Sequence, residues 1–494
     1  MLKTKPYEFW FVTGSQHLYG DDALKEVGSH SKEMIDQMNE QGDLSYPIVF
    51  KSVLTTSKDI HKIMVEANAD EKCAGLITWM HTFSPAKMWI AGLKALQKPL
   101  LHLHTQYNRE IPWESIDMDF MNLNQSAHGD REYGFMVSRM NIARKVVVGH
   151  WQDESVIEKV SGWMKTAVAF TEGTNIRVAR FGDNMRNVAV TDGDKVEAQM
   201  KFGWTVDYYG IGDLVEEMEG ITDKQVDELF REYQQLYDLP EEAGQEGEVQ
   251  GSIKEQARIE LGLKSFLNSR NYNAFTTNFE DLHGMKQLPG LAVQRLMAEG
   301  YGFAGEGDWK TAALLRMMKI IANNEGTSFM EDYTYHLEKG KEMILGSHML
   351  EICPTVSATK PRIVVHPLSM GDREAPARLV FDGQGGEGIN VSLVEMGGRY
   401  RLIINELQAH QPEVETPLLP VAKVIWEPKP SLSEATEAWI HAGGAHHTVF
   451  SFHVTTDQLY DFTEMAKIEC VVIDKDLKMR QFRNELKWNQ AIWG

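Results

Sequence analysis

The first third of the chain alternates short runs of apolar residues with longer stretches in which apolar residues recur at helical spacing. The apolar runs predict strands at 8–13, 47–54, 73–79, 99–104 and 145–149. Helix-length stretches lie between them at 22–39, 57–67 and 85–96. Continuous apolar strands separated by helices are typical of a parallel sheet that is covered on both faces.

The middle third carries a second set of such elements, which begins with a strand predicted at 175–182. A helix is expected after Thr222, because Gln225 follows at the spacing of a capping box. Its apolar residues fall on one helical face and are Val226, Leu229, Phe230, Tyr233 and Leu236. The acidic stretch 241–250 predicts a solvated loop. A strand at 274–279 and a helix at 308–323 complete an open α/β layer.

After about residue 325 the predicted strands follow one another without helices between them, at 362–367, 377–382, 389–395, 400–406 and 422–427. This pattern favours an antiparallel sheet or a small barrel. Two helices, near 457–466 and 476–490, flank a final strand at 468–473. We therefore predict an α/β domain at 1–174, a second α/β domain at 175–326 and a β-rich domain at 327–494.

Composition narrows the classes of protein that the chain can represent. Its 494 residues are 43% hydrophobic and 24% charged, as in ordinary globular proteins. With 50 basic and 71 acidic residues the net charge is −21, which disfavours nucleic acid and anionic membranes as partners. No apolar run reaches the ~18 residues of a membrane span. Three scattered cysteines, Cys73, Cys353 and Cys470, predict a reducing, cytoplasmic location.

Two glycine-rich turns invite a nucleotide-binding interpretation. Residues 383–388 read G-x-G-x-x-G, but a dinucleotide site needs a helix next, and residues 389–394 alternate like a strand. We predict a hairpin turn there, which disfavours a nucleotide-dependent oxidoreductase. The polar turn 13–20 after the first strand either binds a ligand or is a plain turn.

Two glutamates stand in unusual surroundings. Glu306 lies between glycines just before a helix, so its carboxylate either approaches a ligand or metal, or it or Asp308 caps that helix. Glu331 interrupts an aromatic-rich, strand-like run. If its side chain points inward it needs a partner, and if it points outward it is ordinary surface.

Among 17 histidines, His348 and the pair His446–His447 have the contexts most suggestive of ligands. Neighbouring side chains of an extended chain point to opposite faces, so one of the pair is expected to face a given site. Both face it only if Gly443-Gly444 bend the backbone. No local metal-binding motif is present, so a metal site must be assembled from distant positions.

Five segments together resemble the bacterial L-arabinose isomerases. They are FWFVTGSQHLYG at 9–20, TWMHTFSPAKMWI at 78–90, FAGEGDWKTAAL at 303–314, SFMEDYTYH at 328–336 and GGAHHTVFS at 443–451. The resemblance covers essentially the whole chain. It implies two Rossmann-like parallel-sheet domains followed by a β-rich domain that contains a barrel. It also implies interconversion of L-arabinose and L-ribulose, often with D-galactose and D-tagatose, by a homohexamer that depends on a divalent cation, usually Mn²⁺.

The resemblance also implies roles for individual residues. The metal ligands would be Glu306, Glu331, His348 and His447, and the two glutamates would also carry the acid–base catalysis. The sugar pocket would be lined by Gln16, His128, Met185, Phe279, Met349 and His446. An enediol mechanism suits this set, and a hydride shift between carbons is its rival. From another class, a non-catalytic sugar-binding protein of similar α/β lobes is the alternative.

Overall fold

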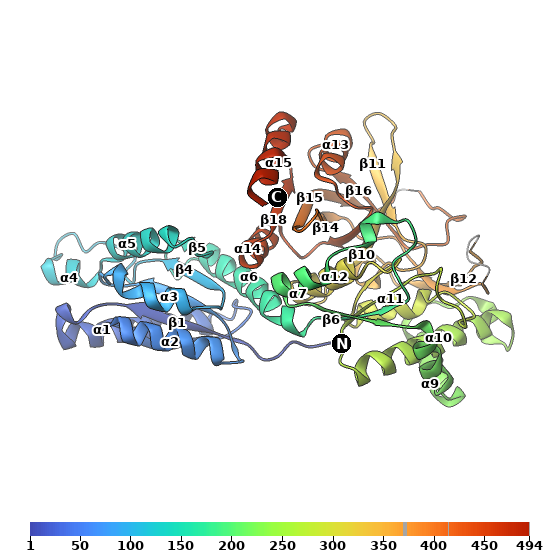
Figure 1. Ribbon diagram of the computed structural model, residues 1–494, viewed down its shortest axis with the longest axis horizontal. Coiled ribbons are helices and arrows are strands. Elements are labelled where there is room, and N and C mark those ends of the chain that lie inside the picture. The colour runs from blue at the N-terminus through green and yellow to red at the C-terminus, as the bar shows by residue number, and fades with distance from the viewer. Residues whose placement is uncertain (369–372, 413, 494) are drawn as a thin grey trace. The chain divides into compact units, whose positions relative to one another are not determined.

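The computed structural model (Figure 1) describes residues 1–368, 373–412 and 414–493, and the chain forms two compact units. The N-terminal unit comprises Thr4–Thr171 and Tyr460–Met465. The main unit comprises Met1–Lys3, Glu172–Leu459 and Ala466–Gly494. The division into three domains stays a prediction. None of the helices in the described ranges combines the length and apolarity that a membrane span requires.

A five-stranded parallel sheet forms the centre of the N-terminal unit, as its apolar runs predict, with the order β2-β1-β3-β4-β5. The strands are β1 Glu8–Gly14, β2 Ile48–Leu54, β3 Cys73–Met80, β4 Leu100–His104 and β5 Lys145–Val148. The helices of this unit are α1 Gly20–Glu40, α2 Ser57–Ala69, α3 Ile90–Ala95, α4 Met118–Leu123, α5 Ser126–Arg139 and α6 Glu154–Thr171.

Both faces of this sheet are covered, because successive side chains of a strand point to opposite sides. On β1, Trp10 and Val12 pack in one apolar cluster with side chains of α2, α3 and α5. Phe9 points the other way, with its ring centroid 5.3 Å from that of Trp163 on α6. The near-continuous burial of β1 and β3 follows from this double cover.

Histidines gather at the carboxyl edge of the sheet, the edge at which open α/β sheets bind ligands. His81, directly after β3, is fully buried, stacks on Trp79 and shares a 2.9 Å hydrogen bond with His30. Burial, with a smaller contribution from His30, lowers the pKa of His81 from 6.5 to about 3. The folded protein therefore holds this imidazole neutral at neutral pH.

This burial makes the N-terminal unit sensitive to acid. The unfolded chain protonates His81 below pH 6.5 and the folded chain does so only near pH 3, so stability is lost as pH falls between these values. The slope is about 1.4 kcal/mol per pH unit. Urea unfolding should show that the wild type loses about 2 kcal/mol more than His81→Gln between about pH 6.5 and 5. Equal losses in the two proteins would contradict this assignment.

The main unit begins with a four-stranded parallel sheet of order β7-β6-β8-β9. Its strands are β6 Arg177–Phe181, β7 Thr205–Tyr209, β8 Ala274–Thr277 and β9 Gly302–Ala304. The helices that accompany them are α7 Lys195–Phe202, α8 Ile211–Glu219, α9 Asp223–Leu236, α10 Glu248–Ser269, α11 Gly290–Ala298 and α12 Trp309–Ile321. A second α/β layer is therefore confirmed.

Two helices of this layer test the sequence pattern directly. Helix α9 has the capping box between Thr222 and Gln225 that the spacing predicts. Its predicted apolar face is buried except for Leu236, which is 46% exposed at the last turn. The predicted loop 241–250 is wrong at its end, because α10 already begins at Glu248.

The rest of the main unit is rich in strands, as predicted. A seven-stranded sheet has the order β14-β17-β10-β11-β16-β15-β18, and all its pairs are antiparallel except β15 with β18. Its strands are β10 Thr327–His336, β11 Met343–Ser347, β14 Gly386–Glu395, β15 Tyr400–His410, β16 Lys423–Pro428, β17 His447–Ser451 and β18 Glu469–Ile473. Strand β14 begins within the glycine-rich segment, so the strand predicted there is confirmed. The predicted hairpin turn is wrong, because the preceding strand Ala377–Val380 pairs with Arg362–Val365, whereas β14 pairs with β15 and β17.

Strand β14 also pairs with β15, so the hydrogen-bonded pairs run in a cycle through six of these strands. The cycle is compatible with the expected barrel, which stays a prediction. The main unit also contains the two-stranded pair β12 Arg362–Val365 and β13 Ala377–Val380, and the helices α13 Leu432–Ala442 and α15 Met479–Trp493. Helix α14 Thr456–Ala466 belongs mostly to the N-terminal unit.

Helix α12 is buried along its whole length, including the charged residues Lys310, Arg316 and Lys319. It contacts β8 and β9 of the parallel sheet and β10, β14 and β17 of the mixed sheet. Each buried charge has polar partners within the unit, among them Asp308 for Lys310 and the Gly300 carbonyl for Arg316. The N-terminus of α12 is thereby held rigidly where the two sheets meet.

Candidate active site

The loop between β9 and α12 contains two acidic residues, Glu306 and Asp308, which have different roles. Asp308 is the N-cap of α12: its Oδ1 accepts from the backbone N–H of Thr311 at 3.2 Å, and its Oδ2 accepts from the Thr311 hydroxyl. Glu306 has a left-handed backbone with φ 61°, and it lines the neighbouring cavity. The capping function that the sequence left open belongs to Asp308, and Glu306 is free to face a cavity.

A cavity of about 290 Å³ opens beside this loop, entirely within the main unit. Both candidate glutamates line it, so Glu331 points into the site rather than to the surface. Most of the wall is apolar or weakly polar, but it also contains His348 and a third glutamate, Glu351. Its other residues are Met185, Thr277, Phe279, Leu282, Leu288, Pro289, Gly305, Tyr333, Met349, Leu350 and Leu368. Such a wall with a few convergent polar groups is typical of a small-molecule site.

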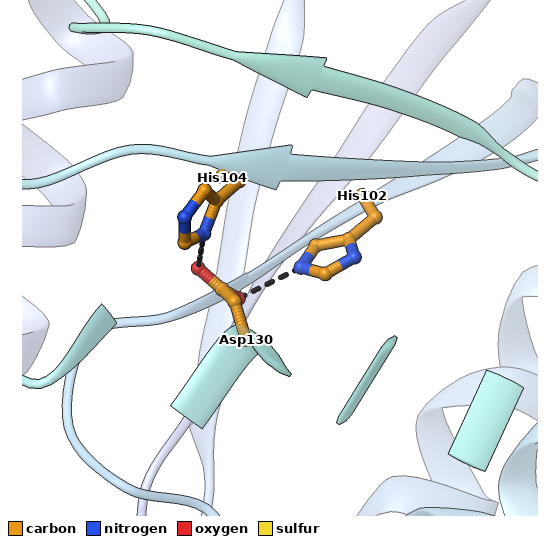
Figure 2. A group of neighbouring side chains, drawn as sticks. All are labelled: His102, His104 and Asp130. Carbon is orange, nitrogen blue, oxygen red and sulfur yellow. Dashed lines mark hydrogen bonds and ion pairs between the residues drawn. The ribbon is translucent and has the colours of Figure 1, made fainter. Parts of the chain in front are cut away.

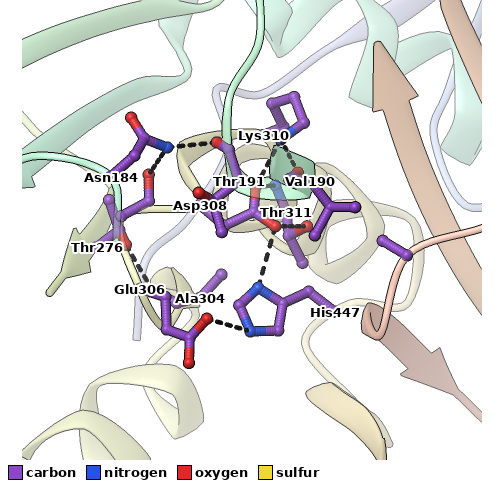
Figure 3. A network of polar contacts seen from close by, with 12 residues as sticks. Asn184, Val190, Thr191, Thr276, Ala304, Glu306, Asp308, Lys310, Thr311 and His447 are labelled. Atoms are coloured by element: carbon purple, nitrogen blue, oxygen red, sulfur yellow. Dashed lines mark hydrogen bonds and ion pairs between the residues drawn. The ribbon is translucent and has the colours of Figure 1, made fainter. Parts of the chain in front are cut away.

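Two carboxylates flank the imidazole of His447, which is fully buried (Figure 3). Its Nδ1 lies 3.2 Å from Oδ2 of Asp308, and its Nε2 lies 3.6 Å from Oε2 of Glu306. Among the described residues that Nε2 has no hydrogen-bond partner. Nε2 of His446 lies 3.9 Å from the same Glu306 oxygen. Both histidines of the pair therefore approach Glu306, after a left-handed turn at Gly443 with φ 78°.

His348 repeats the arrangement of His447. Its Nδ1 is 2.6 Å from Oε2 of Glu351, an oxygen that also accepts from the backbone N–H of Leu350. The ring centroids of His348 and His447 are 5.8 Å apart. A Cβ atom on Gly305 would lie 3.3 Å from Nε2 of His348, so this glycine lets the imidazole come close to the Glu306 loop. Each ring has Nδ1 oriented by a carboxylate, which leaves Nε2 for another partner.

The charged groups of the site shift one another's pKa values. Burial alone would raise the pKa of Glu306, but the imidazoles of His446, His447 and His348 lower it below its usual value. Burial would lower the pKa of His348, but Glu351 and the two cavity glutamates raise it to about 9. The carboxylates therefore concentrate negative charge in the site, which favours protons on His348 and His446 and also suits a cation in place of those protons.

The structure brings most of the expected site residues to one place. Met185, Phe279, Glu306, Glu331, His348 and Met349 line the cavity, and His446 and His447 border Glu306. Gln16, after β1, and His128, exposed on α5, belong to the N-terminal unit, so their part in this site stays a prediction.

Donor atoms of Glu306, His446 and His447 lie within 4.8 Å of one another. The resemblance assigns His446 to the sugar pocket, but the structure places it in this group of possible metal ligands. The sequence does not identify Asp308 and Glu351 as the residues that orient His447 and His348. It indicates Asp308 only as a possible helix cap, and it indicates no role for Glu351. The one available signal for Glu351 was an acidic residue three positions after His348.

A cavity lined by the carboxylates of Glu306, Glu331 and Glu351 and bordered by three imidazoles is typical of enzyme sites. Comparison with known proteins specifies the family. Residues 3–175, 177–324 and 326–469 match the models of the L-arabinose isomerase N-terminal, central and C-terminal domains. The chain belongs to the L-arabinose isomerase family.

Relatives that match over their full length support the same family. The L-arabinose isomerase of Geobacillus stearothermophilus is 66% identical over 100% of this chain and 99% of its own length. That of Clostridium beijerinckii is 62% identical over 100% of both chains. That of Bacillus subtilis (strain 168) is 60% identical over 100% of this chain and 99% of its own.

Proposed function

We propose that this chain interconverts L-arabinose and L-ribulose, with D-galactose and D-tagatose as a second substrate pair. The family supports the substrate class, and the observation that carries the reaction is the pair of glutamates, Glu306 and Glu331, on one apolar cavity. Moving a carbonyl from C1 to C2 removes a proton from the carbon beside the carbonyl and returns it to the neighbouring carbon. This chemistry needs a base and an acid within reach of both carbons.

The residues of the cavity supply these groups. Glu306 is ionised at neutral pH because three imidazoles lower its pKa, so it is ready to accept a proton. Glu331 lies opposite His447 in the register of β10 and β17 and opposite Ser347 in that of β10 and β11. One carboxylate moves the carbon-bound proton and the other carries the hydroxyl proton. The apolar side chains around them exclude water from the enediol.

A divalent cation, Mn²⁺ in this proposal, would be held by Glu306, Glu331, His348 and His447. The donor set fits, because Nε2 of His447 is buried without a hydrogen-bond partner among the described residues. Nδ1 of each histidine is also already bound to a carboxylate, as in metal sites with oriented imidazoles. When bound, the cation supplies Lewis-acid stabilisation of the negative charge that develops on the sugar oxygens.

Ketose formation from L-arabinose tests this proposal. The full-length protein is assayed with Mn²⁺, and again after treatment with a chelator. We expect ketose only from the metal-loaded protein, and solvent exchange of deuterium placed at C2. Sugar binding without any ketose would instead favour a non-catalytic sugar-binding protein. Complete retention of deuterium would favour the hydride shift.

The carboxylate behind His348 provides a further prediction. Glu351→Gln replaces the acceptor of His348 Nδ1 with an amide of the same size, so the imidazole is less well oriented. We expect Mn²⁺ affinity to fall about 10- to 100-fold, which is usual for the loss of such a partner. Titration of activity with Mn²⁺ measures it. Glu338→Gln, an exposed residue after β10, is the control, and equal Mn²⁺ affinities in the two variants would refute the role of Glu351.

A further inference from the structure

A second group of metal-ligating side chains lies in the N-terminal unit, at the carboxyl end of β4 (Figure 2). His102 and His104 are two positions apart on this strand, so both side chains point to the same face of the sheet. Asp130 on α5 meets both rings from that face. Nε2 of His102 lies 2.9 Å from Asp130 Oδ1, and Nδ1 of His104 lies 2.8 Å from Asp130 Oδ2.

The geometry of this group suits a small transition cation. Its three donor atoms lie within 4.8 Å of one another. Bonds of about 2.0–2.2 Å in tetrahedral arrangement separate ligand atoms by about 3.3 Å, which lies between the 2.8–2.9 Å of the two hydrogen-bonded pairs and the 4.8 Å limit of the group. Two imidazoles and one carboxylate match the preferences of Zn²⁺ and related ions and leave a fourth position for water.

The surroundings hold the group in place and leave it accessible. Asp130 Oδ1 also accepts from the backbone N–H of Met80 at 3.1 Å, which orients the carboxylate. The ring of His102 is buried at right angles against Tyr133, with the centroids 5.0 Å apart. The side chain of His104 is 27% exposed and gives a cation a path from solvent.

We propose that His102, His104 and Asp130 form a second cation site, selective for Zn²⁺-like ions and built from none of the residues that line the cavity with Glu306. The proposal goes beyond the function proposed above and does not depend on it. Nδ1 of His102 is buried without a hydrogen-bond partner among the described residues, whereas His348 and His447 each have a carboxylate at Nδ1. Because such partners contribute about 10- to 100-fold to affinity, the second site binds its ion more weakly than a fully supported site.

Zn²⁺ titration of the chelator-treated full-length protein by calorimetry tests the proposal. His104→Gln removes one ligand at a partly exposed position, and Asp130→Asn keeps the shape of the carboxylate but removes its charge. His61→Gln, an exposed histidine on α2, is the matched control. We expect His104→Gln and Asp130→Asn to bind one Zn²⁺ fewer per chain than the wild type and His61→Gln. Circular dichroism confirms that each variant is folded.

The same comparison in a Glu306→Gln background separates the two sites. Loss of one further Zn²⁺ when His104→Gln is added to Glu306→Gln supports the second site, whether or not the Glu306 cavity binds metal. Co²⁺ in place of Zn²⁺ should give the visible absorption of a four-coordinate centre, lost in His104→Gln and retained in Glu306→Gln. If folded His104→Gln binds as many Zn²⁺ ions as the wild type, with the same affinity, the three residues form only a hydrogen-bonded network and the proposal is wrong.

Discussion

Glu306→Gln is expected to lower kcat for L-arabinose by at least about 10³-fold and to leave the fold intact. The amide keeps the size of the side chain and its φ of 61°, but it cannot accept the substrate proton and is a poor cation ligand. General acid–base catalysis alone contributes about 10²- to 10⁴-fold, and the loss of a ligand adds to this. Ketose formation under saturating sugar and Mn²⁺ measures the effect.

Glu331→Gln should show a loss of the same order, because in the proposed reaction Glu306 and Glu331 share the proton transfers. Glu338→Gln, an exposed carboxylate just after the same strand, makes the same chemical change away from the cavity and should retain wild-type kcat. Activity within tenfold of the wild type in either cavity variant would remove that glutamate from the catalytic assignment.

Gly307→Ala is expected to destabilise the main unit by about 3 kcal/mol or more. Gly307 has a φ of 79°, which costs an alanine about 1–2 kcal/mol. Its Cβ atom would also lie 2.6 Å from the Asp183 carbonyl oxygen and 2.7 Å from Cα of Asn184, both of them backbone atoms. Overpacking of this kind costs about 1–3 kcal/mol. Urea unfolding measures the loss, and activity should fall because Glu306 is the adjacent residue.

Gly340 provides a matched control for this substitution. Its φ is 84°, close to that of Gly307, but a Cβ atom there would have no neighbour within 4 Å. Gly340→Ala should therefore lower the free energy of unfolding only by the cost of the left-handed backbone, about 1–2 kcal/mol, and leave activity unchanged. If the two variants were equally stable, the close contact with Asp183 and Asn184 would not be the cause.

Strands such as β1 and β3 could be predicted from the sequence because they are buried on both faces of the sheet. Nearly every position in such a strand is apolar, so the strand appears in the sequence as a continuous apolar run. Helix α10 was not predicted because it directly follows an acidic, glycine-containing stretch and its buried side includes polar side chains. Gln256 and Glu260 on that side are satisfied by Gln287 and Arg295, which come from other elements. Partners of this kind have no local sequence signal.

The candidate site also contains residues that local sequence could identify and contacts that it could not. Glu306 and His447 could be singled out because each stands in an unusual local context, between glycines or after a glycine pair. The pairing of His447 with Asp308, across 139 residues, could not be, because it depends on how β17 packs beside α12. Residue type and local context therefore identified candidate ligands, and tertiary packing determined which carboxylate orients which imidazole.

The complete burial of α12 also limits how this enzyme can evolve. A helix with no solvent-facing position has no residue at which substitution is neutral by default, since each side chain fills space between the two sheets of the main unit. Changes that adjust the reaction have to arise instead in the cavity wall, where Met185, Phe279 and Met349 are only partly buried. We therefore expect substitutions in α12 to destabilise the fold and substitutions in the cavity wall to be tolerated more readily.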